Sequence, residues 1–166
     1  MHPHEQLIAR LFEGLHNHKP DEMAECYRDD ATFHDIAFDL RGKRQIQAMW
    51  KMICLPTKED LPSTIEVTVK LIKAKGDGVR AEVVEHYRMR DKDKYGRSVD
   101  NSITSIFEFH QDGRISSHKD DCDSVAWAKQ AMGPLVGSIV GRIGWLRRWL
   151  AMRKLRRAYL DAFRDD

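Results

Sequence analysis

Two short stretches of the sequence carry the side chains best suited to chemistry. Asp35 lies in "ATFHDI", where apolar and polar residues alternate as in a half-buried strand, and a carboxyl group there costs free energy unless something pairs with it or uses it. His118 and Asp120 lie two residues apart in "ISSHKDDCD", so both point to the same face of a strand. A desolvated carboxyl group can move a proton on a bound carbon acid, and a histidine can pass that proton on. We therefore name Asp35, His118 and Asp120 as candidate catalytic residues.

Each candidate also has a plainer interpretation. Asp35 could begin a turn and accept hydrogen bonds from nearby backbone groups, as Asp often does. His118 and Asp120 could form a structural pair that closes the base of the fold. The sequence leaves both interpretations open, because it does not show whether Asp35 and His118 meet.

The elements that must position these residues follow from hydrophobic periodicity. Apolar residues at helical spacing predict helices at about 4–17, 20–27 and 46–53, and a later helix, "SVAWAKQAM", is capped by Asp123 or Ser124. Alternation predicts strands at 31–36, from 63 onward, at 80–90, at 99–109 and at 115–123, with turns at "KGDGV", "DKDKYGRS" and "HQDGR". Helices followed by a run of antiparallel strands indicate an α+β fold.

The inward faces of these strands supply candidate binding residues. In the strand at 80–90 the alternation is poor, so either His86 and Arg88 or Glu85 and Tyr87 point inward, and we name His86 and Arg88 as candidates. The other candidates for the pocket wall are Tyr27, Phe33, Trp50, Asn101, Ile103, Ser105 and Phe107. Large apolar residues at such spacings are also typical of plain core, and where a pocket is the unfilled end of the core they can be both.

Length, charge and cysteine usage limit the classes of protein that the sequence fits. The 166 residues suit one domain, and a net charge of +2 gives no argument for a polyanionic partner across the whole surface. The three cysteines form no CxxC pair, which predicts a reducing, cytoplasmic setting. We find neither a signal peptide pattern nor an apolar run of the ~18 residues that a membrane span needs.

The last part of the chain, 133–166, differs from 1–132. We expect "GPLVGSIVGRIGW" to be a glycine-containing loop, and "LRRWLAMRKLRRAYLDAF" to be a basic amphipathic helix with Trp145, Trp149, Met152, Leu155, Tyr159 and Phe163 near one face. This helix could pack on its own domain or a partner subunit, lie on an anionic membrane surface, or bind nucleic acid. The aromatic stripe favours packing or a dimer contact with the arginines facing water, peripheral membrane contact comes second, and no nucleic acid partner is expected.

Two segments also resemble a known family. "CYRDDATFHDIAFDLRGKRQI" and "FEFHQDGRISSHKDDCD" are similar to segments of the nuclear transport factor 2-like superfamily, and within it of the SnoaL-like group, over about 4–132. The resemblance implies a cystatin-like cone, in which a curved, mostly antiparallel sheet wraps over three N-terminal helices and leaves an apolar pocket at its mouth. It also implies a homodimer formed through the sheet face, and chemistry without metal or cofactor; no HxH or HExxH spacing here suggests a metal site, for example at His86, His118 and Asp120.

Three enzyme types of this superfamily can be compared residue by residue. In ketosteroid isomerase-like members the first-strand carboxylate, which Asp35 resembles, is the general base, while Leu11 and Ser105 occupy the positions of the oxyanion donors. In limonene epoxide hydrolase-like members Asp120 matches the last-strand aspartate, but His86 and Arg88 stand at the Arg-x-Asp pair. In SnoaL-type polyketide cyclases a late-strand aspartate works with a histidine, as Asp120 and His118 would.

The resemblance and the residues together predict a cofactor-independent enzyme that acts on a small, largely apolar substrate by general acid/base chemistry. An isomerase, a cyclase and a hydrolase all fit. The alternative is a non-catalytic ligand-binding or protein-assembly domain that has kept the cone and lost the chemistry.

Overall fold

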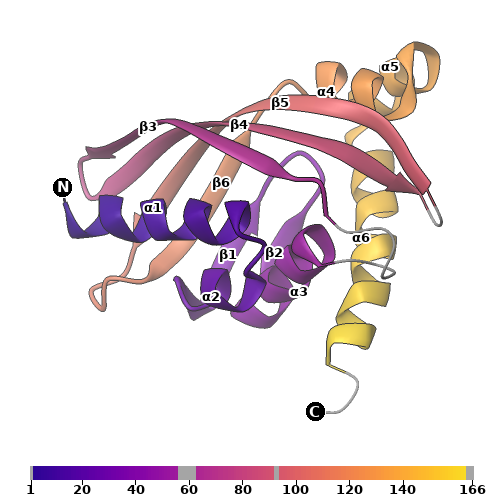
Figure 1. Cartoon of the computed structure of the whole chain (residues 1–166). Helices are drawn as coiled ribbons and strands as arrows, with labels where there is room; N and C mark the ends of the chain where they lie inside the picture. The colour runs from indigo at the N-terminus through magenta and orange to yellow at the C-terminus, as the bar shows by residue number, and fades with distance from the viewer. Residues whose placement is uncertain (1, 56–62, 92–93, 164–166) are drawn as a thin grey trace.

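A computed structural model describes residues 2–55, 63–91 and 94–163. Its elements, in chain order, are α1 (Pro3–His16), α2 (Pro20–Ala24), β1 (Tyr27–His34), β2 (Asp39–Arg41), α3 (Lys43–Cys54), β3 (Glu66–Lys75), β4 (Gly78–Asp91), β5 (Lys94–Phe109), β6 (Ile115–Asp121), α4 (Ser124–Met132), α5 (Pro134–Arg142) and α6 (Gly144–Ala162). The sheet arches over α1, α2 and α3, and α4, α5 and α6 lie together at one end of it (Figure 1). The predicted α+β cone with a C-terminal helical extension is confirmed.

The six strands form one sheet in the order β2-β1-β6-β5-β4-β3. All neighbours pair antiparallel except β1 and β6, which run parallel. This arrangement sets β1 directly beside β6, with Phe33 opposite His118. The two stretches that carry the candidate catalytic residues are therefore adjacent in the sheet although more than 80 residues separate them in sequence.

The core lies between the concave face of the sheet and the N-terminal helices. In α1 the buried apolar residues recur at helical spacing, and in α3 a second apolar stripe faces the sheet. The start of α1 is held by a capping box between His2 and Glu5, and Asp123 caps α4 by accepting hydrogen bonds from the backbone N–H groups of Val125 and Ala126. Asp123 therefore has the capping role that the sequence predicted.

Strand alternation is regular in β5 and interrupted in β3. Every second residue of β5 from Val99 to Phe107 is buried, as predicted. In β3 the pairing with β4 shifts its register between Val69 and Leu71, so Ile72 packs against the core while Leu71 is exposed. The alternation of Ile65, Val67, Val69 and Leu71 in the sequence predicts one shared face for the strand from 63 onward. This is wrong for Leu71, because a bulge moves the later residues to the opposite face.

The C-terminal extension consists of three packed helices. The stretch expected to be a loop, "GPLVGSIVGRIGW", contains α5, which lies against α4. A Cβ atom at Gly137 would lie 2.3 Å from the carbonyl oxygen of Ala128, and one at Gly141 would lie 2.7 Å from the Cα of Val125. These glycines permit a close backbone approach of α5 to α4, within a helix rather than the expected loop.

Helix α6 returns along the body of the molecule and packs on α3. Leu155 is buried there, and Ala151, Tyr159 and Phe163 pack against the core. Trp145 and Trp149, which the sequence placed near the same face, are exposed. Among the residues described, no helix combines the length and the apolar character that crossing a membrane requires.

Candidate functional site

A chain of hydrogen bonds links Tyr27, His118 and Asp120 below the surface. The Tyr27 hydroxyl lies 2.7 Å from Nδ1 of His118, and Nε2 of His118 lies 2.8 Å from Oδ1 of Asp120. Burial, with the charge of Asp120 adding, raises the pKa of Tyr27 well above its ordinary value, so its hydroxyl stays protonated and donates to Nδ1. Nε2 then carries the imidazole hydrogen and donates it to the carboxylate.

His118 is enclosed by aromatic rings. Its ring centroid lies 4.2 Å from that of Phe107 and 4.8 Å from that of Phe33, and Trp50 and Tyr27 complete the enclosure. Only 1% of the His118 side chain is exposed, against 14% for Asp120. The indole Nε1 of Trp50, also buried, has no hydrogen-bond partner among the described residues. Within the chain of hydrogen bonds, Asp120 is therefore the member that reaches the surface.

Asp120 is held from two strands. Ser105 lies opposite it on β5 and donates a hydrogen bond of 2.5 Å from its hydroxyl to Oδ1, the same oxygen that His118 approaches. Two donors on one oxygen fix the orientation of the carboxylate. The predicted same-face arrangement of His118 and Asp120 is confirmed, whereas Asp121 has the opposite parity and is exposed.

Asp35 follows β1 and combines the two interpretations that its sequence left open. Its Oδ1 accepts hydrogen bonds from the backbone N–H groups of Ala37, at 2.6 Å, and Phe38, at 2.5 Å, so it does shape the turn between β1 and β2. Burial nevertheless raises its pKa to about 6. These hydrogen bonds and the electrostatic influence of the nearby His118 oppose the rise, and the charge of Asp120 adds to it. Asp35 is thus a turn residue whose carboxyl group is also poised to exchange a proton near neutral pH.

Glu85 is a functional candidate that the sequence analysis did not select. It lies on the inner face of β4, opposite Asn101, and burial together with the charges of Asp120 and Asp35 raises its pKa to about 8. Tyr87, two residues on, accepts a hydrogen bond of 2.6 Å from the indole of Trp127 on α4. The alternation of β4 could have pointed to Glu85. Ala81 and Val83 are buried at two-residue spacing, and Glu85 is the next residue on the same inward face.

His86 and Arg88 lie on the opposite, exposed face of β4, so the expectation that they line the pocket is wrong. Nδ1 of His86 lies 2.6 Å from Oδ1 of Asp100, and the Arg88 guanidinium stacks over the ring of Tyr95. His86 cannot join His118 and Asp120 in a metal site, because the side chains point to opposite faces of the sheet.

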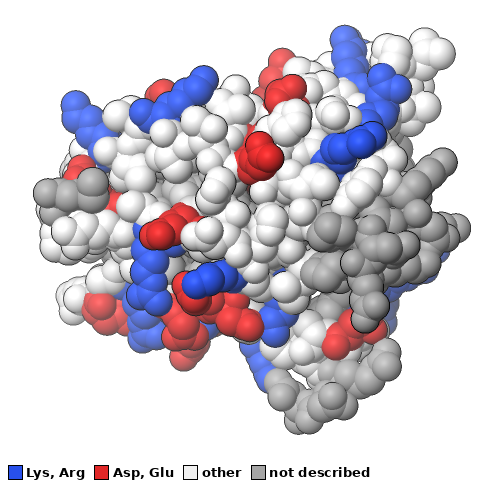
Figure 2. Space-filling view, viewed as in Figure 1, with Lys and Arg blue, Asp and Glu red and all other residues white. Residues whose placement is uncertain are grey.

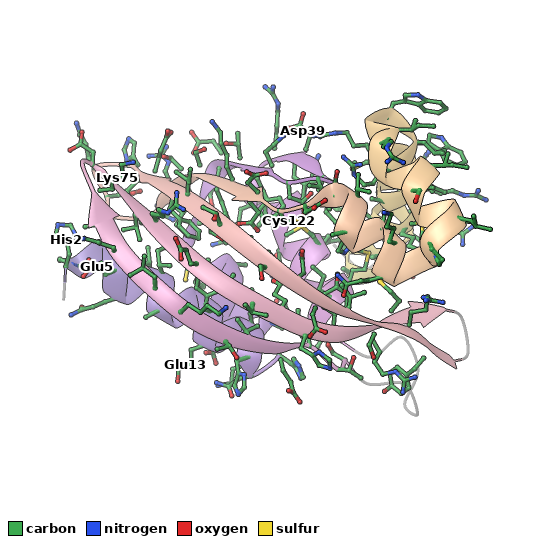
Figure 3. All side chains as sticks on the ribbon, turned by 90° about the horizontal axis from the view of Figure 1, so that it is seen from above. His2, Glu5, Glu13, Asp39, Lys75 and Cys122 are labelled. Atoms are coloured by element: carbon green, nitrogen blue, oxygen red, sulfur yellow. The ribbon has the colours of Figure 1, made fainter. Side chains whose placement is uncertain are left out.

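The remaining predicted wall residues lie on the inner side of the sheet or against it. Those that are buried are Tyr27, Phe33, Trp50, Asn101, Ile103, Ser105 and Phe107. Tyr27, Phe33, Trp50 and Phe107 surround His118 as core, while Asn101 and Ser105 lie next to the carboxyl groups. Asn101 also donates toward Cys122, whose pKa burial raises to about 11 (Figure 3, at the end of β6 beside the C-terminal helices).

An open hollow of about 370 Å³ gives access to Asp35 and Asp120. It is lined by His34, Asp35, Ile36, Thr104, Ile106, Lys119, Asp120, Asp121, Arg147 and Arg148. His118 does not line it, so a proton moving between His118 and the hollow passes through Asp120. Asp35 and His118 therefore do not face one common space directly.

Two arginines of α6 form one wall of the hollow. Arg147 donates from Nε to the carbonyl oxygen of Ile36, at 2.5 Å, and from Nη1 to that of Gly141, at 2.7 Å. Arg148 donates from Nη2 to the carbonyl oxygen of Asp35, at 3.2 Å. The sequence analysis expected the tail arginines to face water, and these two instead tie α6 to the loop that carries Asp35.

The comparisons with known proteins agree with this fold. The model of the family described as the SnoaL-like domain matches residues 8–118. No curated protein matches. Similar solved structures include an LEH-like epoxide hydrolase from M. tuberculosis, with a TM-score of 0.62, 21% identity, and coverage of 83% of this chain and 96% of that one.

Two further structures show the same fold. A protein with a ketosteroid isomerase-like fold from Catenulispora acidiphila, solved in complex with trimethylamine, has a TM-score of 0.60 at 15% identity, with 75% of this chain and 91% of that one covered. A protein provisionally assigned as a SnoaL-like polyketide cyclase from Shewanella putrefaciens has a TM-score of 0.63 at 17% identity, with 78% and 96% covered. Because the family model matches more than half of the chain, and because these structures share the arched sheet over helices, the chain belongs to the SnoaL-like domain family.

Proposed function

We propose that this chain is an enzyme that converts a small, largely apolar molecule by general acid/base chemistry at the hollow beside Asp35 and Asp120. The observation that carries the proposal is the gathering of three carboxyl groups, Asp35, Glu85 and Asp120, each close enough to act on another electrostatically. Carboxyl groups held this way, in a fold that keeps them from water, are typical of sites that transfer protons.

The different surroundings of the carboxyl groups suggest a division of roles. With a pKa of about 6, Asp35 is mostly ionised at pH 7 and suits a general base. With a pKa of about 8, Glu85 is mostly protonated at the same pH. It does not line the hollow, so it would act on Asp35 and Asp120 through its charge rather than on the substrate itself. Asp120, oriented by His118 and Ser105, would hold a water molecule or a polar group of the substrate, and the proton would pass on to His118.

Arg147 and Arg148 would stabilise negative charge that develops on the substrate. Both line the hollow next to Asp35. Leu11 and Ser105 stand where related isomerases carry oxyanion donors, so a positive charge from α6 would supply electrostatic stabilisation that those positions lack. This role fits an enolate-like or alkoxide-like intermediate, and therefore an isomerase, a cyclase or a hydrolase.

The test is turnover by the full chain of two probe sets: small cyclic and aryl epoxides for hydrolysis, and β,γ-unsaturated ketones for isomerisation. For a substrate that is converted, Asp35→Asn should lower kcat/KM by about 10²–10⁴-fold, the usual contribution of a general base. The amide keeps an oxygen at Oδ1 for the Ala37 and Phe38 N–H groups, so the turn should persist. Asp39→Asn, at an exposed aspartate of β2, is the matched control and should retain activity.

A second function, ligand binding without turnover, is favoured by two observations. His118 is enclosed, and the Asp35 carboxylate already accepts a backbone hydrogen bond that shapes the turn. On this interpretation the chain would bind probe molecules, seen by calorimetry, without converting them. Asp35→Asn would then leave activity at the background level and change only affinity. Turnover that survives unchanged in folded Asp35→Asn would contradict the acid/base proposal.

A further inference from the structure

The outer surface of α5 and α6 combines large apolar side chains with positive charge. Its exposed apolar residues are Leu135, Val136 and Ile139 on α5 and Trp145, Trp149 and Leu160 on α6. Leu135 is 83% exposed and Trp145 is 74% exposed, which is unusual for side chains of this size. We call these residues, with Arg142, Arg153 and Arg156, the α5–α6 outer surface.

The charge on this surface has one sign. Between Ser124 and Leu160 the sequence contains no Asp or Glu. The exposed cations in this segment are Lys129, Arg142, Arg153, Lys154, Arg156 and Arg157. At the corner occupied by α5 and the start of α6, Figure 2 shows Lys and Arg side chains beside uncharged surface, without acidic side chains on the face in view.

The geometry of α6 separates this surface from the protein interior. At 3.6 residues per turn, Trp145, Trp149, Arg153 and Arg156 follow one another along one side of the helix, and Leu160 continues the row. The buried Leu155 and the loop-binding Arg148 lie on other sides. The Arg153 guanidinium lies 5.7 Å from the Trp149 ring centroid, so cation and aromatic ring form one unit on the outer side.

We propose that the α5–α6 outer surface binds the surface of an anionic lipid bilayer. Tryptophan rings are enriched at the boundary between headgroups and acyl chains, where aliphatic residues such as Leu135 and Ile139 can also be buried. Arginines beside them would contact acidic headgroups, each strengthening binding. The helices would lie along the membrane rather than cross it.

Charge and chemistry argue against the other occupants. A second copy docked through the same surface would set Arg142, Arg153 and Arg156 against an identical set, with no acid in the segment to neutralise them. A nucleic acid would satisfy the arginines but would leave the aliphatic side chains of α5 without an apolar partner. Of these three occupants, the anionic bilayer is the one that offers both negative charge and an apolar phase.

The experiment is co-sedimentation of the full chain with vesicles, either of phosphatidylcholine alone or of phosphatidylcholine mixed with phosphatidylglycerol. We expect binding to the mixed vesicles to be at least about tenfold tighter than to the neutral ones, and to weaken in high salt. Trp145→Ser combined with Trp149→Ser should reduce binding about tenfold or more, because the substitutions remove both rings from the membrane interface. The matched control, Leu55→Ser with Val69→Ser, removes exposed apolar side chains outside α5, α6 and the outer face of the sheet, and should bind as the unchanged chain does.

Arginine variants test the charge separately. Arg153→Gln with Arg156→Gln should reduce binding to the mixed vesicles about tenfold, whereas Lys70→Gln with Lys73→Gln, exposed cations of β3, should leave it unchanged. Circular dichroism should show all four double variants folded, because these side chains are exposed. Absence of binding by the folded chain, or full binding by the tryptophan variant, would overturn the proposal. Loss of a dimer in that variant, without vesicle binding, would overturn it in favour of a second copy.

Discussion

At the scale of single residues, the site depends on where the fold keeps a side chain from water. The sequence predicted that His118 and Asp120 share a face, because strand parity is local. It did not predict that Phe33 and Phe107 enclose His118, because those rings come from strands that pair with β6 only in the folded sheet. Asp35 could be predicted as a turn residue or as a proton carrier, and the structure supports both properties in one side chain.

Glu85→Gln should make the folded protein more stable at high pH. The pKa of Glu85 is about 8 in the folded state, against about 4.3 in an unfolded chain. The free energy of unfolding is therefore unaffected by Glu85 ionisation below pH ~4, and it falls as the pH rises through 8, because the charged form is disfavoured in the folded state. The glutamine variant does not ionise and should gain about 2 kcal/mol of unfolding free energy at pH 9, after allowance for partial solvent access, and little at pH 4.

Urea unfolding at pH 4, 7 and 9 measures this difference. Glu108→Gln makes the same chemical change on the exposed face of β5. Its effect on the free energy of unfolding should not increase between pH 4 and pH 9. An equal gain for Glu85→Gln at pH 4 and pH 9 would show that ionisation of Glu85 is not the cause.

Tyr27→Phe should destabilise the protein although it removes a single oxygen. The change leaves Nδ1 of His118 buried without the hydroxyl that lies 2.7 Å away, and an unsatisfied buried group costs about 1–3 kcal/mol. Thermal or urea unfolding gives the loss, and Tyr159→Phe, on the half-buried side of α6, is the control. A loss no larger than that of the control would mean that the Tyr27 hydroxyl does not hold His118.

At the scale of elements, the sequence predicts which segments are helices and which are strands. It does not predict which residues face inward where a strand is irregular. The periodicity of α1, α3 and α4 and the alternation in β5 are strong, and each element forms where the pattern indicates. In β3 a bulge moves the residues after Val69 to the opposite face. In β4 the inward positions of Glu85 and Tyr87 follow from the alternation of Ala81 and Val83, but their polarity hides that continuation. The four-residue glycine spacing of 133–144 was interpreted as a loop, because glycine lowers helix propensity; contact with α4 outweighs that cost in α5.

Gly137→Ala should therefore disrupt the packing of α5 on α4. The new Cβ would lie within 2.5 Å of backbone atoms of Ala128 and Lys129, which cannot move aside as a flexible side chain can. We expect a loss of about 1–3 kcal/mol and faster amide exchange across α5. Gly144→Ala is the matched control: its Cβ would meet the Arg147 guanidinium at an ordinary 3.8 Å, and alanine favours the helix, so stability should hold or rise. Equal effects of the two substitutions would contradict close packing as the cause.

At the scale of the whole molecule, the exposed outer face of the sheet is a second surface that a partner could cover. Leu71 and Ile106, both on this outer face, are 38% and 47% exposed. Ile106 also lines the hollow, so a partner on this face would border the hollow. Unlike the α5–α6 outer surface, this face mixes charges: Arg80 and Lys119 lie near Glu82 and Glu108, so two copies can meet without like charges opposing one another. We therefore place the predicted homodimer on the sheet face and the lipid contact on the helices.

Sedimentation velocity over a range of concentrations tests this division. The chain should sediment as a dimer. Leu71→Lys with Ile106→Lys should raise the dissociation constant of the dimer about tenfold or more, because each new charge would be buried without a partner. Trp145→Ser with Trp149→Ser should leave the dimer intact, since those residues belong to the other surface. A chain that stays monomeric at every concentration would contradict the dimer, and one that dissociates only in the tryptophan variant would assign the dimer contact to α6 instead of the sheet.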